Sequence, residues 1–268
     1  MPHLTLLFIG DVFGKPGRDL VRLGVPKLVR QYDVTAVIAN AENSAGGFGI
    51  TRETGDELLA AGVDLMTSGN HVWDKKEALD YIPLEPRFVR PANYPAGVPG
   101  AGSAIMRTSQ GEEVAVLNLM GRVFMTAIDD PFSLGAREAA RLRARTPIVL
   151  VDMHAEATSE KLAMGWHLDG KVTAVVGTHT HVQTADEQIL PGGTAYITDV
   201  GMTGPHDGVI GVEREPVIHR FLTGLPARFE AARGLPKLHA VVITADTTTG
   251  RATAIERISL TKAALEAM

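Results

Sequence analysis

Side chains able to bind metal ions gather at the ends of several apolar runs in the chain. Two of these groups are short motifs that contain imidazoles, Gly69-Asn70-His71 and His179-Thr180-His181. Histidines two positions apart at a strand end can both reach one site, whereas a lone Gly-Asn pair is typical of a turn. Three further groups follow apolar runs in the same way: Asp11, Glu42-Asn43 and His154. Each alone fits a capping, turn or structural role, but together they predict a metal-binding pocket.

The predicted ligand atoms are oxygens and imidazole nitrogens. The chain has no cysteine, which excludes thiolate ligands, disulfides and cysteine nucleophiles. This ligand set suits manganese, iron, zinc, cobalt or magnesium, and the sequence does not choose among them. Only two of the groups are carboxylates, so two divalent ions would keep a net positive charge that attracts a phosphate. Two metals roughly 3.5–4 Å apart can clamp a phosphoryl group for in-line displacement, which favours a phosphoesterase.

The elements that position these groups alternate between strand and helix in the first part of the chain. Runs rich in Val, Ile, Leu and Ala predict strands at 4–10, 34–41, 63–68, 114–120, 148–153, 172–177, 194–199, 238–245 and 252–260. The intervening segments predict helices at 17–32, 51–61, 74–81, 133–144 and 159–167, with part of 216–232 also helical. Strands that alternate with helices indicate a parallel sheet, and ligands bind such sheets at the carboxyl ends of strands.

Local signals refine this prediction. Pro26 is expected to begin a second helical piece within 17–32. The last two strands, joined by Thr247-Thr248-Thr249-Gly250, form a predicted antiparallel hairpin. The turn-rich stretch 91–103 is read as an internal connection, so residues 1–268 are predicted to form a single domain. Helix starts are predicted at capping residues, namely Thr51, Asp74, Ser133, and Thr158 or Ser159.

Composition limits the partners. The formal net charge is −5 and no basic cluster stands out, so no strong nucleic-acid-binding face is predicted. No apolar run is long enough for a membrane span, and the apolar start lacks the basic leader of a signal peptide. A cytoplasmic location is the default expectation. The sequence leaves the oligomeric state open, and a homo-oligomer remains one alternative.

Other metal and nucleotide motifs fit less well. Gln183 and Thr184 occupy the positions where a metallo-β-lactamase has Asp and His. An amidohydrolase barrel carries His-x-His on its first strand, whereas here that strand ends in Asp11. A His-Glu-x-x-His motif and a P-loop are both absent from the sequence.

The motifs resemble those of the calcineurin-like metallophosphoesterase superfamily. Phe13 stands where that superfamily has His, and Ala41-Glu42 stands where it has a bridging Gly-Asp. The altered pattern resembles the YmdB-like phosphodiesterases, a branch of this superfamily. The matching segments, which span nearly the whole chain, are 10–14, 42–43, 69–74, 154–161, 177–186 and 199–205.

This resemblance implies a four-layer α-β-β-α sandwich of two mixed sheets, with the site at the carboxyl ends of the strands. It implies hydrolysis of 2′,3′-cyclic nucleotides, with 3′,5′-cyclic nucleotides as further candidates, by a hydroxide that bridges two metals. Iron or manganese would be the usual metal, and His71 would protonate the leaving oxygen. One metal would be held by Asp11, Glu42, Asn43 and His181, and the other by Glu42, Asn70, His154 and His179.

Some expectations rest on weaker signals. Arg18, His206 and Asp207 lie where they could contact substrate, although Arg18 also fits an exposed helix charge and the other two fit a turn. Two other functions stay open. One is a phosphomonoesterase or nucleotidase with the same metal centre, and the other is a metal-stabilised regulatory protein without enzymatic activity.

Overall fold

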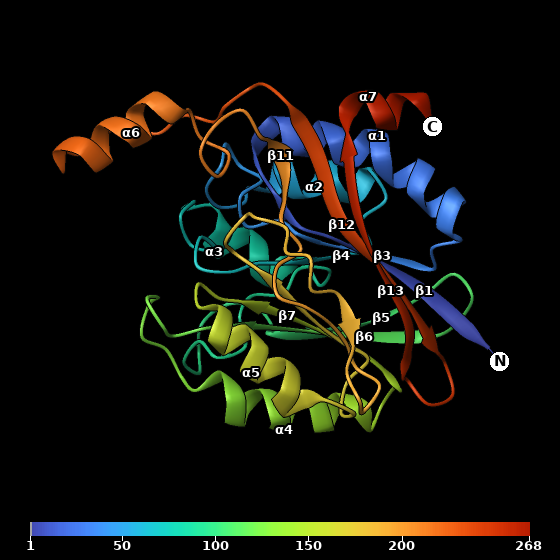
Figure 1. Cartoon of the computed structure of the whole chain (residues 1–268). Coiled ribbons are helices and arrows are strands. Elements are labelled where there is room, and N and C mark those ends of the chain that lie inside the picture. The colour runs from blue at the N-terminus through green and yellow to red at the C-terminus, as the bar shows by residue number, and fades with distance from the viewer. Residues whose placement is uncertain (1) are drawn as a thin grey trace.

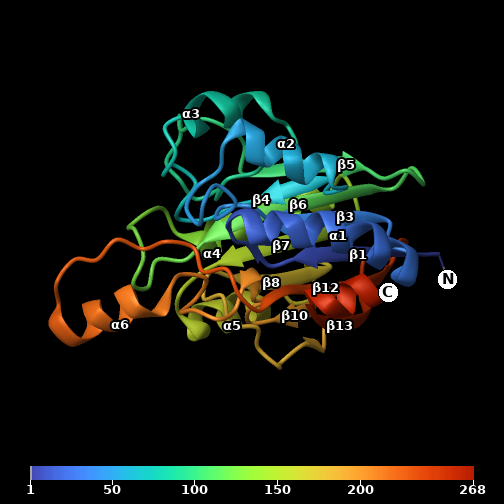
Figure 2. The same cartoon turned by 90° about the horizontal axis from the view of Figure 1, so that it is seen from above.

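Two stacked β-sheets form the centre of the molecule in the computed structural model, which describes residues 2–268 (Figures 1 and 2). The neighbouring strands β1, β3 and β4 of the first sheet are parallel, and β12 runs antiparallel to β1. This sheet has the order β2 (Asp11–Val12), β11 (Met202–Pro205), β12 (Pro236–Asp246), β1 (His3–Ile9), β3 (Ala36–Asn40) and β4 (Leu65–Thr67), and β13 (Ala252–Thr261) also pairs with β12.

The second sheet is parallel at its centre and antiparallel at both edges. Its four inner strands, β6, β7, β8 and β10, run in one direction, and β5 and β9 pair antiparallel at the edges. Its order is β5 (Ser103–Arg107), β6 (Glu113–Met120), β7 (Ile148–His154), β8 (Ala174–Thr178), β10 (Ala195–Ile197) and β9 (Gln188–Ile189).

Helices cover the outer face of each sheet. In Figure 1 the first sheet lies below α1 (Gly14–Tyr32) and α2 (Arg52–Ala60), and the second sheet lies above α4 (Pro131–Arg143) and α5 (Thr158–Leu168). This arrangement confirms the predicted four-layer α-β-β-α sandwich of two mixed sheets. The remaining helices are α3 (Ala78–Tyr81), the 3-10 helix η1 (Ile82–Leu84), α6 (Arg214–Thr223) and α7 (Lys262–Ala267).

Alternation along the strands creates three apolar cores. On β1, Leu4, Leu6 and Phe8 point between the two sheets, while Leu7 and Ile9 point toward the helices that cover the first sheet. On β7, alternate residues likewise divide between the inter-sheet core and the core beneath α4 and α5. Because the side-chain period of a strand is two, a run that is apolar throughout can serve both faces.

The helix predictions need several corrections. Pro26 does not begin a new helical piece, because α1 is continuous across it. Pro26 and Arg22 are both exposed, so water can bind the Arg22 carbonyl that lacks an N–H partner. The helix expected at 74–81 is confined to α3, and Asp74 lies before it in a turn. The chain from 224 to 232 is not helical.

Of the predicted capping residues, Thr51 caps its helix and the others do not. Thr51 caps α2 as expected, since its hydroxyl accepts the backbone N–H of Thr54 within a capping box. Helix α4 begins earlier than predicted because Asp130, rather than Ser133, accepts the first free N–H groups. Helix α5 spans Thr158–Leu168 with Ala157 at its N-cap and no side-chain cap.

Four short strands and two short helices escaped prediction: β2, β5, β9, β11, η1 and α7. The strand β11 reads Met-Thr-Gly-Pro, a composition typical of turns, and it is a strand because β2 and β12 pair with it. The predicted hairpin of β12 and β13 is confirmed. Among the described residues, no helix combines the length and apolar character that crossing a membrane requires.

Candidate metal centre

The inner faces of the two sheets become polar at the carboxyl ends of their strands. On β7 the inward positions run from Ile148 and Leu150 to Asp152 and His154. On β3 the inward positions end at Asn40, and Glu42 follows two residues later. The five predicted strand-end groups therefore converge where the inter-sheet core meets the edge of the sandwich.

Four ligand atoms converge at the first cluster. His154 Nε2 lies 3.1 Å from Glu42 Oε1, 2.8 Å from Asn70 Oδ1 and 3.1 Å from His179 Nδ1. His154 and Glu42 are fully buried, and Glu42, His154 and His179 form a group whose ligand atoms all lie within 4.8 Å of one another. These are the four residues that the family resemblance assigns to one metal.

Hydrogen bonds on the far side of His154 determine which nitrogen faces this cluster. The Thr178 hydroxyl donates to Asp152 Oδ1 over 2.7 Å. The same hydroxyl oxygen lies 2.9 Å from His154 Nδ1, so it accepts the Nδ1–H. Neutral His154 therefore presents the lone pair of Nε2 to Glu42 and Asn70.

The same reasoning applies to His179. Its Nε2 lies 3.1 Å from Glu156 Oε2, so Nε2–H donates outward to that carboxylate and Nδ1 is the nitrogen with the lone pair. When His154 is neutral, two imidazole lone pairs, a carboxylate oxygen and an amide oxygen thus point at one small volume. Such a donor set repels itself unless a cation binds it, so these residues fit a metal ion.

A second cluster adjoins the first through Glu42. His181 Nε2 lies 3.7 Å from Asp11 Oδ1 and 3.1 Å from the Asn43 amide. His181 Nδ1 donates to the Ile210 carbonyl over 2.9 Å, which leaves Nε2 as the nitrogen with the lone pair that faces Asp11. Asp11 is fully buried and its Oδ1 has no hydrogen-bond partner. A buried carboxylate oxygen without a partner is costly, and a metal ion would satisfy it.

Burial and neighbouring charges shift the pKa values of these groups. Burial alone would raise the pKa of Glu42, but His154 outweighs that effect and lowers it to about 2. Burial alone would lower the pKa of His154, but Glu42 raises it to about 9. Burial, and then the neighbouring His154, lower the pKa of His179 to about 3. A proton on His154 and a metal ion are therefore alternative ways to compensate Glu42.

The backbone around the histidines is unusual. His179 and His181 both have positive φ angles, 102° and 65°, which are uncommon for non-glycine residues and concentrate at functional sites. Asp199 holds this turn, because its Oδ2 accepts the N–H and the hydroxyl of Thr180. The buried Lys161 ammonium lies 2.6 Å from the same oxygen and compensates the Asp199 charge.

Gly69 permits the close approach of the two sheets. A Cβ atom at this position would lie 2.1–2.4 Å from atoms of the His154 ring. Any side chain here would displace the imidazole, so the glycine of Gly69-Asn70-His71 is a steric requirement of the cluster.

His71 lies beside the cluster and faces its rim. Its backbone N–H donates to Glu42 Oε2 over 3.0 Å, and its Nδ1 lies 2.7 Å from Asp74 Oδ2. The Phe48 ring packs edge-on against the imidazole at 5.1 Å between centroids. Asp74 and Phe48 thus fix the ring with Nε2 pointing away from Asp74.

Comparisons with known proteins decide the family. The model of the YmdB-like protein family matches residues 7–258. The chain belongs to the YmdB-like family. One relative of this YmdB-like protein, from Bacillus subtilis, is 54% identical over 95% of this chain and 96% of its own length, and is named a 2′,3′-cyclic-nucleotide 2′-phosphodiesterase.

Two solved structures share the fold of the YmdB-like protein. A novel phosphatase from Mycoplasma pneumoniae is 34% identical, with a TM-score of 0.91 over 97% of this chain and 94% of that chain. A hypothetical protein from Thermus thermophilus is 44% identical, with a TM-score of 0.89 over 96% and 99% of the two chains. These comparisons confirm the family resemblance and agree with the predicted class of enzyme, a phosphoesterase.

The weaker substrate candidates lie in different surroundings. Arg18 of the YmdB-like protein is engaged within the protein, because its guanidinium binds Glu57 and the Ser44 carbonyl. His206 Nδ1 donates to the Gly204 carbonyl, and Asp207 Oδ1 accepts the N–H of Gly234. Arg18 therefore steadies the loop after β3, and the other two side chains fix the approach to α6.

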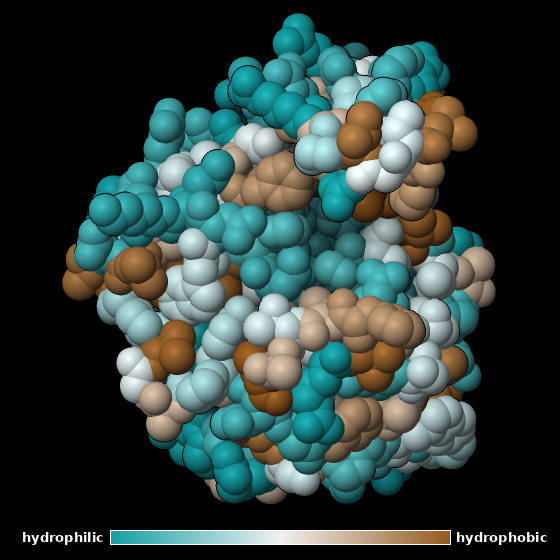
Figure 3. Space-filling view, turned by 90° about the vertical axis from the view of Figure 1, so that its left-hand side faces the viewer, coloured by the Kyte–Doolittle hydropathy of each residue, from teal (hydrophilic) through white to brown (hydrophobic). Residues whose placement is uncertain are grey.

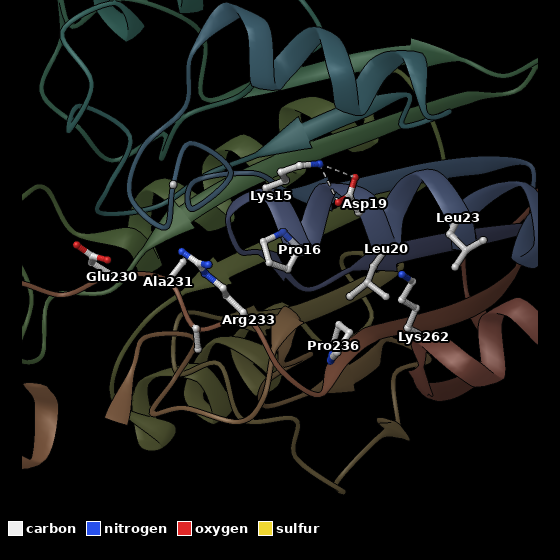
Figure 4. A pocket seen from close by; sticks show the side chains of 12 residues that line it. Lys15, Pro16, Asp19, Leu20, Leu23, Glu230, Ala231, Arg233, Pro236 and Lys262 are labelled. Atoms are coloured by element: carbon white, nitrogen blue, oxygen red, sulfur yellow. Dashed lines mark hydrogen bonds and ion pairs between the residues drawn. The ribbon is translucent and has the colours of Figure 1, made fainter. Parts of the chain in front are cut away.

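The surface above the metal centre is hollowed. Figure 3 looks onto the left-hand side of Figure 1, where the carboxyl ends of the strands lie, and shows a hollow lined by hydrophilic residues. A separate cavity of about 600 Å³ lies between the first turns of α1 and residues 230–236 (Figure 4). No predicted metal ligand lines it, so this cavity is distinct from the metal centre.

Residues that support the candidate ligands gave weaker sequence signals than the candidate ligands themselves. Asp152 accepts hydrogen bonds from Asn40 and Thr67 of the first sheet and from Thr178 of the second, so it links both sheets beneath the site. Its sequence signal was an acid inside the apolar run Ile148–His154, two residues before a ligand. Lys161 and Asp199 gave no pairing signal, because they lie 38 positions apart in the sequence.

Proposed function

We propose that this YmdB-like protein is a dinuclear-metal phosphodiesterase that hydrolyses 2′,3′-cyclic nucleotides. The observation that carries the proposal is the pair of adjoining donor clusters, which share Glu42 and contain the buried Oδ1 of Asp11 that has no hydrogen-bond partner. The name of the Bacillus subtilis relative supports this choice of substrate. Cyclic 3′,5′-nucleotides are the second substrate in the proposal.

Each cluster would hold one divalent ion, with Glu42 between them. When bound, the two metals supply positive charge to the phosphate and lower the pKa of a water nucleophile. Oxygen and imidazole donors without sulfur suit iron or manganese, with zinc, cobalt or magnesium as alternatives. Asp11, Asn43 and His181 belong to one cluster, and Asn70, His154 and His179 belong to the other.

His71 is the proposed general acid. Its Nδ1 is committed to Asp74, so Nε2 is the nitrogen that can pass a proton to a leaving ribose oxygen. The backbone N–H of His71 holds Glu42 Oε2, which places the acid next to the shared carboxylate.

The proposal also covers the domain organisation, the partner and the location of the protein. Ligands come from both sheets, and residues 1–268 are therefore proposed to act as one domain. A small phosphoester is the proposed partner, and the cytoplasm is the proposed location. The formal net charge of −5 gives no reason to propose a nucleic-acid-binding surface.

A metal-resolved substrate panel tests the function. The full chain is purified without chelator, its metals are counted by mass spectrometry, and it is assayed on 2′,3′-cyclic nucleotides, 3′,5′-cyclic nucleotides and nucleoside monophosphates. We expect two metals per chain and the highest kcat/KM on 2′,3′-cyclic nucleotides, with a single monophosphate product.

Two outcomes contradict the proposal. Faster turnover of monophosphates would favour the phosphomonoesterase alternative, which the name of the Mycoplasma pneumoniae phosphatase also suggests. A fully metal-loaded protein that cleaves no phosphoester, including an activated aryl phosphodiester, would leave the centre with a structural role.

A further inference from the structure

The loop that follows β3 presents one aromatic ring at the rim of the metal centre. It begins with Glu42 and Asn43, which belong to the donor clusters, and continues through Gly46-Gly47-Phe48-Gly49. Phe48 is the only one of these four residues with a side chain, and its ring is partly exposed. Single exposed apolar side chains are common, so the significance of this ring depends on what holds it and what it touches.

Hydrogen bonds tie the turn that carries Phe48 to the centre. The N–H of Ala45 donates to the Gly49 carbonyl over 2.9 Å, which closes the turn. The N–H of Gly47 donates to the Asn43 carbonyl over 3.1 Å, so the residue before Phe48 is bonded to a residue of the donor clusters. The position of the Phe48 ring is therefore fixed relative to these clusters.

The glycines on either side of Phe48 are steric requirements of this turn. A Cβ atom on Gly47 would lie 2.7 Å from the tip of the Phe13 ring, and one on Gly49 would lie 2.8 Å from Lys75 Cγ. Both glycines also have positive φ angles, 102° and 77°. A side chain at either position would push the turn away from the centre, so the glycines keep Phe48 close to it.

The Phe48 ring belongs to a row of rings that crosses the centre. Its centroid lies 5.1 Å from that of His71 and 6.5 Å from that of Phe13. The Phe13 ring in turn lies 5.7 Å from the imidazole of His181. Phe13 is buried, so Phe48 is the phenylalanine of this row that a substrate can reach.

Other aromatic residues on this side of the molecule are placed differently. Trp73 and Tyr94 pack on each other, with 6.0 Å between their centroids, and against the hydrophobic core of the first sheet. Phe124 is 92% exposed, but it belongs to the loop that follows β6 in the second sheet. Among the phenylalanines that the structure describes, Phe48 is the one whose ring packs on His71.

We propose that Phe48 is the platform on which the base of a cyclic nucleotide stacks, an inference that rests on the phosphodiesterase activity proposed above. In such a substrate the base is attached to C1′, and C1′ is bonded to the carbon that carries the 2′-oxygen. The base therefore lies beside the imidazole when His71 protonates that oxygen, and the Phe48 ring packs on the same imidazole. Every nucleobase has a π-face that can stack on an aromatic side chain.

This contact selects substrates by the presence of a base rather than by its identity. A phenylalanine ring offers no hydrogen bond, so all four bases stack on it, and the larger purines gain more contact than the pyrimidines. Stacking on one aromatic side chain strengthens binding about 5- to 100-fold. The base takes no part in the bond that breaks, so the contact stabilises substrate and transition state alike and appears in KM.

A comparison of two substrates by the metal-loaded full chain tests the proposal. Adenosine 2′,3′-cyclic phosphate and glycerol 1,2-cyclic phosphate share the five-membered phosphodiester ring, and only the first has a base. We expect Phe48→Leu to lower the preference in kcat/KM for the nucleotide by about 5- to 100-fold, mainly through KM. Phe48→Tyr, which keeps the ring, should retain the preference, and so should the control Phe124→Leu.

Equal losses on both substrates would show that Phe48 only positions His71, and would overturn the proposal. Calorimetric binding of adenosine 3′-monophosphate and glycerol 2-phosphate separates this result from a failure of the proposed function. If the unaltered chain cleaves no cyclic phosphate, the phosphodiesterase activity is wrong. The base platform still holds in that case if Phe48→Leu weakens binding of the adenosine compound alone, and it is overturned if the variant weakens both compounds or neither.

Discussion

The two sheets contribute chemically different halves of the proposed metal centre. The first sheet and the loops that follow its strands carry the carboxylate and amide side chains of the oxygen half, namely Asp11, Glu42, Asn43 and Asn70. The second sheet carries the imidazoles of the nitrogen half, namely His154, His179 and His181. The packing of one sheet on the other brings the two halves together.

The protein holds the two halves differently. Each imidazole has its outer nitrogen tied to a separate partner, which is Thr178, Glu156 or the Ile210 carbonyl. The two carboxylates instead accept backbone N–H groups, from His71 at Glu42 and from His179 at Asp11.

This difference assigns separate tasks to the two halves. The nitrogen half is organised in advance, because the outer hydrogen bonds fix each tautomer. The oxygen half provides all the negative charge among the ligands, and only two residues carry it. Asp152 joins the halves, since its carboxylate binds groups from both sheets. Each variant below alters one of these contributions.

Glu42→Gln should have the largest effect. It keeps the size of the side chain but removes half of the ligand charge, and it does so at the residue shared by both clusters. We expect the loss of at least one metal per chain and a fall in kcat/KM of more than about 10³-fold, or about 4 kcal/mol. Metal analysis and phosphodiesterase assays on the same preparation measure both quantities.

Glu156→Gln is the matched control, because Glu156 binds the outer nitrogen of a ligand and not the metal position. Its loss should weaken metal affinity or activity by only about 10- to 100-fold. If Glu42→Gln and Glu156→Gln lowered metal content and kcat/KM equally, the charge of Glu42 would matter no more than the outer hydrogen bond of His179.

His71→Ala should lower kcat by about 10²- to 10⁴-fold while the protein keeps both metals. The acid lies outside both donor clusters, so the two halves of the centre stay intact. Asp74→Asn, which leaves the imidazole in place but removes its charged partner, should cause a smaller loss. If His71→Ala released a metal together with activity, His71 would be a ligand or a structural residue.

Lys161→Met should destabilise the protein by about 3–5 kcal/mol, because it leaves the Asp199 carboxylate buried without a cation. The loss should also loosen the turn that carries His179 and His181, since Asp199 binds Thr180. Urea unfolding followed by tryptophan fluorescence measures the free energy of unfolding.

Two further variants check this account of Lys161. Lys15→Met breaks a surface pair with Asp19 in which the lysine side chain is 74% exposed, and it should change stability very little. The double variant Lys161→Met/Asp199→Asn should recover part of the loss, because it no longer buries an unpaired charge. Equal destabilisation by Lys161→Met and Lys15→Met would contradict a buried ion pair.

The hydrophobic pattern of the sequence predicted the elements that are long and apolar. The parallel arrangement of β1, β3 and β4 and the hairpin of β12 and β13 followed from local sequence. The strand β11 did not, because its Met-Thr-Gly-Pro sequence becomes a strand only through pairing with distant segments. Pro26 misled the prediction because solvent replaces the hydrogen bond that it removes.

The convergence of the candidate donor residues could be predicted because they directly follow apolar runs. Their division into two clusters came from the family resemblance, and the distances around His154 and His181 agree with that division. The supporting contacts depend on sheet packing, which no local pattern encodes. Asp152 reads as an isolated acid in a strand until Asn40 and Thr67 are placed against it.

Metal binding at the cluster around His154 should release a proton from that imidazole and none from Glu42. Glu42 raises the pKa of His154 to about 9, so the metal-free protein keeps this imidazole protonated at pH 7. His179, with a pKa of about 3, and Glu42, with a pKa of about 2, have no proton to lose at that pH. Metal affinity should therefore rise about tenfold per pH unit from pH 6 to 8 and fall as the solution becomes more acidic.

Calorimetry at pH 7 in buffers of different ionisation enthalpy counts the protons released. We expect about one proton for the metal bound by His154, and the same number in His206→Gln, whose imidazole lies outside both clusters. Release of no proton, together with an affinity that is constant from pH 6 to 8, would show that His154 is already neutral before the metal binds. In that case the hydrogen bond from His154 Nδ1–H to Thr178, which itself donates to Asp152, rather than the charge of Glu42, would control the nitrogen half.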